Sequence, residues 1–72
     1  MLLLVFSGLK YSYCYEVGTG HYMLFDNEHK SHIYLQGDDS KNFRKQIEEI
    51  DILPEPEYKT GLLTENLVKL YL

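Results

Sequence analysis

The stretch that decides the fold is YSYCYEVGTGHYMLFDNEHKSHIYLQ, residues 11–36. It contains three runs rich in aromatic and aliphatic residues, separated by Gly18-Thr19-Gly20 and by the polar segment 26–30. Glycine supplies the positive φ angles of tight hairpin turns, and clustered Asp and Asn residues are typical of turns. We therefore predict two consecutive β-hairpins, with strands over residues 11–17, 21–26 and 31–36.

The register of these strands decides which side chains share a face, because a slip of one residue exchanges the two faces. A two-residue turn at Gly18-Thr19 places Tyr15 opposite Tyr22, and a four-residue second loop places Leu24 opposite Ile33. One apolar face then consists of Tyr13, Tyr15, Tyr22, Leu24, Ile33 and Leu35. A three-residue first turn is the alternative, and it would place Met23 and Phe25 inside instead.

Residues before and after this stretch predict a further strand and a helix. The apolar run Leu2–Phe6 predicts a strand that is covered on both sides or lies centrally in a sheet. Phe43, Ile47 and Ile50 recur at helical spacing, so a helix over this segment should cover one face of the sheet. Asp38 is the expected N-cap of this helix, and Asp39 adds negative charge to its first turn.

The C-terminal part predicts an extended connector and a short final helix. Proline lacks a backbone N–H and restricts the residue before it, so Leu53–Glu57, which contains two prolines, should not be helical. From Thr64, a helix of roughly nine residues is expected to dock through Leu67, Leu70 and Tyr71, with Leu63 in contact with Val68. The predicted fold class is α+β: a single domain over residues 1–72, with an antiparallel β-meander of three to four strands, one packed helix and a short C-terminal helix.

Composition favours a folded chain in a reducing compartment. The chain has 72 residues, 44% of them hydrophobic, and includes seven tyrosines and three phenylalanines, so a small packed core is expected. Its one cysteine, Cys14, cannot form an intramolecular disulfide, which favours a cytoplasmic location. Residues 1–6 lack the basic start of a signal peptide and fall far short of the ~20 apolar residues of a membrane span, so no membrane association is expected.

The charge distribution argues against nucleic-acid binding. The net charge is −4, and residues 38–72 hold eight of the eleven acids and five of the seven bases. Because lysine and arginine provide most of the affinity for phosphate backbones, few bases interleaved with acids make a poor nucleic-acid binder. The alternative function is a nucleic-acid-related regulator, either a weak binder through Lys41, Arg44 and Lys45 or an acidic mimic that occupies a DNA-binding protein through Glu48, Glu49, Asp51, Glu55 and Glu57.

No set of residues has the spacing of a catalytic or metal site. In the preferred register Cys14, Glu16 and His21 share a face, with His21 opposite Glu16, yet no His-x-His or i, i+4 pair supports a metal site. A Cys–His nucleophile would also need an orienting third group and an oxyanion donor, which the sequence does not offer. We therefore expect no cofactor, no metal and no enzymatic activity.

The second face of the predicted sheet is the candidate binding site. One short helix covers only one side of so small a sheet, which leaves a surface rich in aromatic residues and methionine, of the kind that protein interfaces select: His21, Met23, Phe25, His32 and Tyr34. We expect a non-enzymatic protein that binds another protein or a second copy of itself as a dimer. Its small, acidic, single-domain character is that of accessory and inhibitor proteins encoded by phages and mobile elements.

Overall fold

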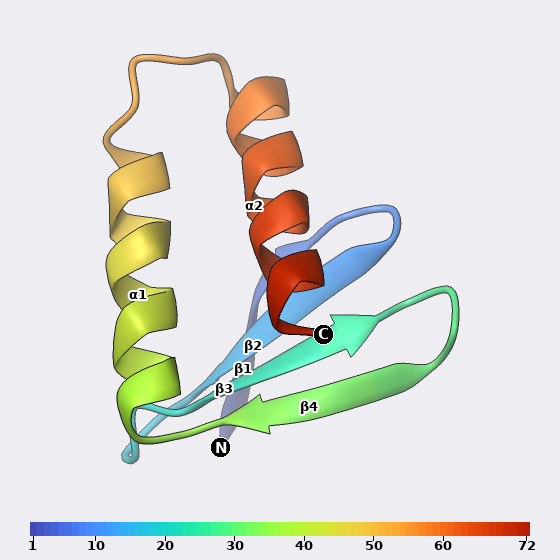
Figure 1. Ribbon diagram of the computed structural model, residues 1–72, viewed down its shortest axis with the longest axis vertical. Helices are drawn as coiled ribbons and strands as arrows, with labels where there is room; N and C mark the ends of the chain where they lie inside the picture. The colour runs from blue at the N-terminus through green and yellow to red at the C-terminus, as the bar shows by residue number, and fades with distance from the viewer.

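The computed structural model describes residues 1–72 as a four-stranded antiparallel sheet followed by two helices (Figure 1). The strands are β1 (Leu2–Ser7), β2 (Tyr11–Glu16), β3 (Tyr22–Asp26) and β4 (Ser31–Leu35), which lie side by side in chain order. The helices are α1 (Asp38–Asp51) and α2 (Glu57–Tyr71). The predicted class, an α+β fold with a meander sheet, is confirmed. Neither helix has the length and apolar content needed to cross a membrane.

The predicted register is confirmed at both hairpins. Tyr15 pairs with Tyr22 across β2 and β3, and Leu24 pairs with Ile33 across β3 and β4. The alternative that buries Met23 and Phe25 is therefore wrong. Gly18 and Gly20 have φ angles of 101° and 77°, which residues with a side chain rarely adopt, so the turn between β2 and β3 requires them.

The core lies between the sheet and both helices, as the apolar face predicts. Its buried members are Tyr13, Tyr22, Leu24, Leu35, Phe43, Ile47, Leu67 and Val68, with Tyr15, Ile33 and Ile50 packed at its margin. The ring of Phe43 is fully buried and lies 5.1 Å from that of Tyr13 and 5.0 Å from that of Tyr22, measured between centroids. Phe43 therefore joins α1 to the middle of the sheet.

The prediction of a covered N-terminal strand is wrong. β1 is an edge strand that pairs only with β2, and Leu2, Leu3, Leu4 and Val5 are 42–65% exposed. Of its residues only Phe6 packs against the core. A β-bulge between Leu4 and Phe6 shifts the register of this pair. An apolar run indicates a strand, but it does not indicate how many neighbours that strand has.

The helix starts differ from those predicted. Gly37, with a φ of 63°, occupies the N-cap of α1 and makes no side-chain cap, so Asp38 belongs to the first turn instead. The final helix begins at Glu57 rather than Thr64, directly after Pro56. It buries Thr64, Leu67 and Val68, and Tyr71 packs against the core, so the predicted docking through Leu67 and Tyr71 is confirmed, whereas Leu70 is 81% exposed. Leu63 and Val68 lie within one continuous helix, so Leu63 is not the staple expected before a helix start at Thr64.

Proline explains the early start of α2, since Pro56 cannot lie inside a helix but fits immediately before its first turn. The helix then continues through Gly61 despite the low helix propensity of glycine. A Cβ at Gly61 would lie 3.9 Å from the ring of Phe6, so this glycine faces the end of β1. The predicted connector is confirmed, but it is shortened at its C-terminal end by the start of α2.

Candidate functional site: the open face of the sheet

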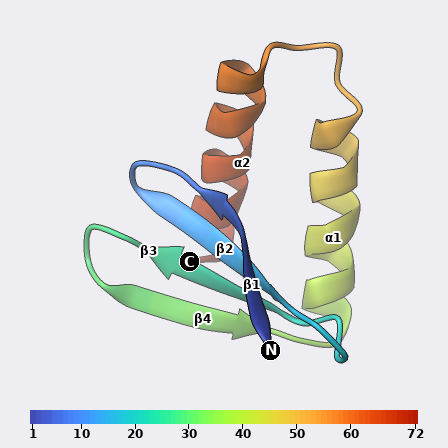
Figure 2. The ribbon, with the colours of Figure 1, turned by 180° about the vertical axis from the view of Figure 1, so that it is seen from behind.

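The face of the sheet that points away from the helices carries the five residues predicted to bind a partner. Met23 and Phe25 alternate along β3 with buried residues, so strand geometry directs them to the opposite side. Strand pairing places Met23 opposite Tyr34 and Phe25 opposite His32, and His21 precedes β3. Seen from behind in Figure 2, strands pass in front of the lower end of α2, α1 stands beside the sheet, and no helix crosses the near face of the sheet. The grouping is confirmed, while binding through it remains a prediction.

This face is wider than the sequence indicated, because β1 extends it. The register places Leu4 opposite Cys14, Cys14 opposite Met23 and Met23 opposite Tyr34, which makes one row across four strands. We define the open face as Leu2, Leu4, Cys14, His21, Met23, Phe25, His32 and Tyr34. Leu2 and Leu4 were missed because their orientation depends on how β1 pairs with β2, and no turn signal fixes that register.

Exposure varies across the open face. Leu4 is 65% and Tyr34 37% exposed, while Met23 and Phe25 are half-buried by their neighbours in the sheet. The rings of Phe25 and His32 lie 5.9 Å apart and pack side by side on adjacent strands. The result is an apolar strip with aromatic rings at one end and leucines at the other.

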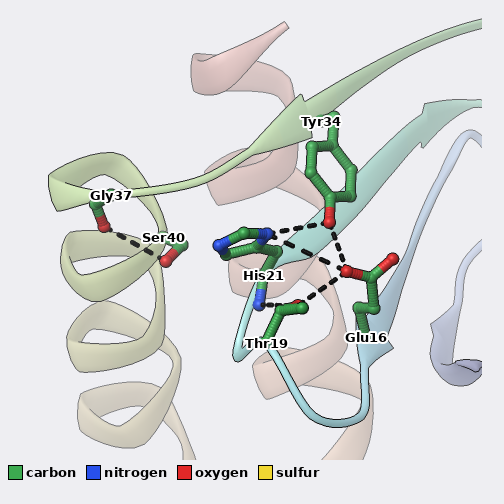
Figure 3. A network of polar contacts seen from close by, with 6 residues as sticks. All are labelled: Glu16, Thr19, His21, Tyr34, Gly37 and Ser40. Atoms are coloured by element: carbon green, nitrogen blue, oxygen red, sulfur yellow. Dashed lines mark hydrogen bonds and ion pairs between the residues drawn. The ribbon is translucent and has the colours of Figure 1, made fainter.

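A polar network fixes the side chain of Tyr34 at the edge of this strip (Figure 3). The Tyr34 hydroxyl donates to Oε1 of Glu16 at 2.5 Å, and Oγ1 of Thr19 donates to the same oxygen at 2.6 Å. Nδ1 of His21 lies 2.8 Å from the Tyr34 hydroxyl. Because the hydrogen of that hydroxyl is already directed to Glu16, the hydroxyl oxygen accepts from Nδ1 of His21.

The network also changes the acidity of its members. Hydrogen bonds from Thr19 and Tyr34 hold the pKa of the Glu16 carboxyl below its ordinary value. The hydrogen bond to Glu16 raises the pKa of the Tyr34 hydroxyl, which stays protonated and able to donate. The network therefore holds the Tyr34 side chain in one orientation.

The same figure shows a separate contact at the start of α1, where Oγ of Ser40 donates to the carbonyl of Gly37 at 3.2 Å.

The thiol of Cys14 and the imidazole of His21 share the open face but do not interact. Burial raises the pKa of the Cys14 thiol, so the nucleophilic thiolate is disfavoured. Nδ1 of His21 is 3.9 Å from Oε1 of Glu16, and His21 makes no hydrogen bond to Cys14. The structure contains no group of three or more histidine, cysteine, aspartate or glutamate side chains placed to hold a metal ion.

Two further features were not predicted from the sequence, and the first is a support for the turn between β1 and β2. Oε1 of Glu65 in α2 accepts hydrogen bonds from the backbone N–H groups of Lys10 at 2.9 Å and Tyr11 at 3.1 Å. Nδ2 of Asn27 donates to the carbonyl of Gly8 at 3.1 Å. These contacts join residues far apart in the chain, so no local signal reveals them.

The second feature is an apolar groove between α1 and α2, which we call the helix groove. It has a volume of about 430 Å³ and is lined by Gln46, Glu49, Ile50, Leu53, Leu63, Asn66, Leu67 and Leu70. An adjoining hollow of about 340 Å³ adds Leu62 and the charged pair Glu55 and Lys59. This surface differs from the open face in being aliphatic, with no aromatic ring in its lining.

The basic residues considered for nucleic-acid binding lie on α1 beside acids. Nε of Arg44 is 3.4 Å from Oε1 of Glu48, one turn further along the helix. Nζ of Lys59 is likewise 3.5 Å from Oε2 of Glu55. Part of the positive charge and part of the acidic run are therefore neutralised within the chain.

Comparison of the chain with protein-family models, with curated proteins and with solved structures finds no match.

Proposed function

We propose that this chain is a small non-enzymatic protein that acts by binding another polypeptide through the open face. The observation that carries the proposal is a sheet with a complete core on one side and no covering element on the other. Aromatic residues and methionine are enriched at protein interfaces, and contiguous exposed apolar surface on a small domain commonly marks an interaction site. Leu4, Met23, Phe25 and Tyr34 provide such a surface.

The hydrogen bonds of Tyr34 support this choice of surface. Ordering flexible side chains on binding costs free energy, so a side chain that is already fixed binds at lower cost. Glu16 and His21 fix the Tyr34 ring, and the β-sheet holds Met23 and Phe25 in place. The histidines and Glu16 also give the apolar strip a polar border, as interfaces generally have.

The open face is favoured over the helix groove because of residue type. Binding energy concentrates on aromatic and arginine anchors, whereas leucine is under-represented among the residues that dominate affinity. The open face offers Phe25 and Tyr34, while the helix groove offers leucines and Ile50. An aliphatic groove between two helices is also the expected margin of a core in so small a domain.

We further propose a cytoplasmic accessory or inhibitor role of the phage or mobile-element type. The support is compositional: a short acidic chain, one unpaired cysteine and no catalytic group. The alternative is an acidic mimic that occupies a DNA-binding protein. Arg44 lies beside Glu48 and Lys59 beside Glu55, so positive charge is interspersed with the acidic segment, which favours the open face as the binding surface.

The proposal is tested with a double substitution, Phe25→Ser with Tyr34→Ser. Because both side chains lie outside the core, the variant should keep the circular dichroism spectrum and melting temperature of the natural chain nearly unchanged. Capture of the partner by the immobilised variant from an extract of the native host should be lost. The matched control is Leu62→Ser with Leu70→Ser in and beside the helix groove, which should leave capture intact. Unfolding of the first variant, or capture lost only in the control, would contradict the proposal.

A further inference from the structure

β1 lacks the charges and prolines that commonly protect an edge strand, and its one protective irregularity is the β-bulge between Leu4 and Phe6. Exposed edges are blunted in most proteins by charged residues, proline or inward-pointing charges, because their free N–H and C=O groups pair with other strands. β1 has the sequence LLLVFS, with no charge and no proline. The opposite edge, β4, is preceded by Lys30 and carries His32, and it is the more polar of the two edges.

The ladder between β1 and β2 determines which backbone groups of β1 are free. The N–H of Val17 donates to the carbonyl of Met1 at 2.9 Å, so Met1 and Val17 form a hydrogen-bonded pair. Such pairs alternate with non-hydrogen-bonded pairs along an antiparallel ladder. Leu3, opposite Tyr15, is then bonded to β2, whereas Leu2 and Leu4 direct their N–H and C=O groups away from the sheet.

The helix side of β1 is also uncovered. Leu3 is 46% and Val5 54% exposed. Two hollows, of about 340 and 290 Å³, separate β1 from the two helices, and Val5 and Tyr13 line both. Phe6 alone reaches the core from β1, and the apolar side chains of residues 2–5 remain exposed on both sides of the sheet edge.

We propose that β1 pairs antiparallel with β1 of a second copy, about a two-fold axis that passes beside Leu3. This register is selected by the free backbone groups, since Leu2 of one copy then lies opposite Leu4 of the other and exchanges two hydrogen bonds with it. The symmetric partner of that pair adds two more. The bulge at Val5 ends the regular part of the edge, which suits a pairing confined to residues 1–5.

The occupant is a second copy because this edge is complementary to itself. Two-fold pairing places only apolar residues opposite each other: Leu3 against Leu3 on the helix side, Leu2 against Leu4 on the open face, and Met1 against Val5 at the two ends. No like charges meet, which is the usual obstacle to self-pairing of a strand. The dimer would contain one continuous eight-stranded sheet, with the two open faces joined. This interface uses the sheet edge, and Leu2 and Leu4 are its only residues on the open face, so Phe25 and Tyr34 stay available to a partner.

A disulfide scan tests the register. In a Cys14→Ser background, Leu3→Cys places two thiols in a non-hydrogen-bonded pair whose Cα atoms are about 4.5 Å apart, within the range of a disulfide. Mild oxidation should give a covalent dimer on a non-reducing gel. The controls Leu2→Cys and Leu4→Cys place like residues on a diagonal, roughly 7–8 Å apart, which is too far for efficient bridging. Equal cross-linking at all three positions, or none at Leu3→Cys, would overturn the proposed pairing.

The oligomeric state provides the second test, by sedimentation velocity from low micromolar to near-millimolar protein. The natural chain should show a concentration-dependent shift from one to two copies. Leu3→Glu sets two carboxylates opposite each other and should abolish the shift while leaving the circular dichroism spectrum unchanged. The Phe25→Ser, Tyr34→Ser variant should still dimerise. A chain that stays monomeric throughout, or a dimer lost only in that second variant, would overturn self-pairing of β1 without deciding partner binding.

Discussion

Leu24 offers the sharpest test of which sheet face is the core. It lies in the middle of the sheet, opposite Tyr13 on one side and Ile33 on the other, and its side chain is 0% exposed. Leu24→Ala removes three buried carbons and leaves a cavity in the cluster that contains Phe43, a change that costs about 2–5 kcal/mol. A chain of this length has a stability of roughly 4–11 kcal/mol, at about 0.05–0.15 kcal/mol per residue. The substitution should therefore remove a large fraction of the free energy of unfolding.

The assay is urea denaturation followed by far-ultraviolet circular dichroism. The matched control is Met23→Ala, on the adjacent residue of the same strand, whose side chain lies on the open face. Its cost should be about 1 kcal/mol or less, since half-exposed side chains transfer little apolar surface from water. Ile33→Ala should fall between the two, because Ile33 lies at the margin of the core. A loss at Met23 equal to or larger than that at Leu24 would refute the assignment of the faces.

Three further predictions concern side-chain contacts or burial, and a fourth concerns the charge of the chain. Glu65→Ala should cost about 1–3 kcal/mol in the free energy of unfolding, because the N–H groups of Lys10 and Tyr11 lose a charged acceptor. A Cβ at Gly8 would overlap the Glu65 side chain, so Gly8→Ala should cost less in the Glu65→Ala background than alone, as measured by a double-mutant cycle of urea melts. Burial raises the pKa of Tyr13 to about 12 from 10.0, so its contribution to stability is complete below pH 10.0 and is lost as the pH rises through about 12; a tyrosinate absorbance titration should show a late phase that Tyr13→Phe removes. Tyr34→Phe removes one hydrogen bond to Glu16, so NMR titration should find the lowered pKa of the Glu16 carboxyl moved back toward 4.5. In the natural chain the stability from this carboxylate is present above pH 4.5 and is lost as the pH falls through the lowered pKa. Fluorescence anisotropy with random duplex DNA at physiological salt should show no binding at micromolar protein, and salt-sensitive binding would contradict the charge argument.

The central hairpins were predictable because several local signals agree there. The glycines around Thr19 and the polar loop 26–30 each fix the length of a turn, and both turns place the same alternate residues on one face. The helical spacing of Phe43 and Ile47 then identifies what covers that face. The same alternation also predicts the five residues of the candidate site, because their side chains lie on the opposite face of the sheet from the core.

The features that were not predicted correctly from the sequence depend on contacts between distant parts of the chain. The apolar run of β1 is compatible with a central or an edge strand, and only its pairing with β2 and the reach of the helices decide between them. The start of α2 was placed too late because Thr64 is a residue type typical of a helix start, whereas burial of Thr64, Leu67 and Val68 stabilises a longer helix that begins at Glu57. The acceptor role of Glu65 toward residues 10 and 11 has no local counterpart in the sequence.

Position-specific photo-cross-linking tests the proposed function most directly. A benzophenone amino acid replaces His32, which is exposed on the open face, or Glu49, which is exposed on α1, in chains expressed in the native host. If the open face contacts another polypeptide, irradiation should give a discrete adduct from position 32 and none from position 49, and Phe25→Ser with Tyr34→Ser should abolish it. Adducts that form only from position 49, or no adduct from position 32, would contradict binding through the open face.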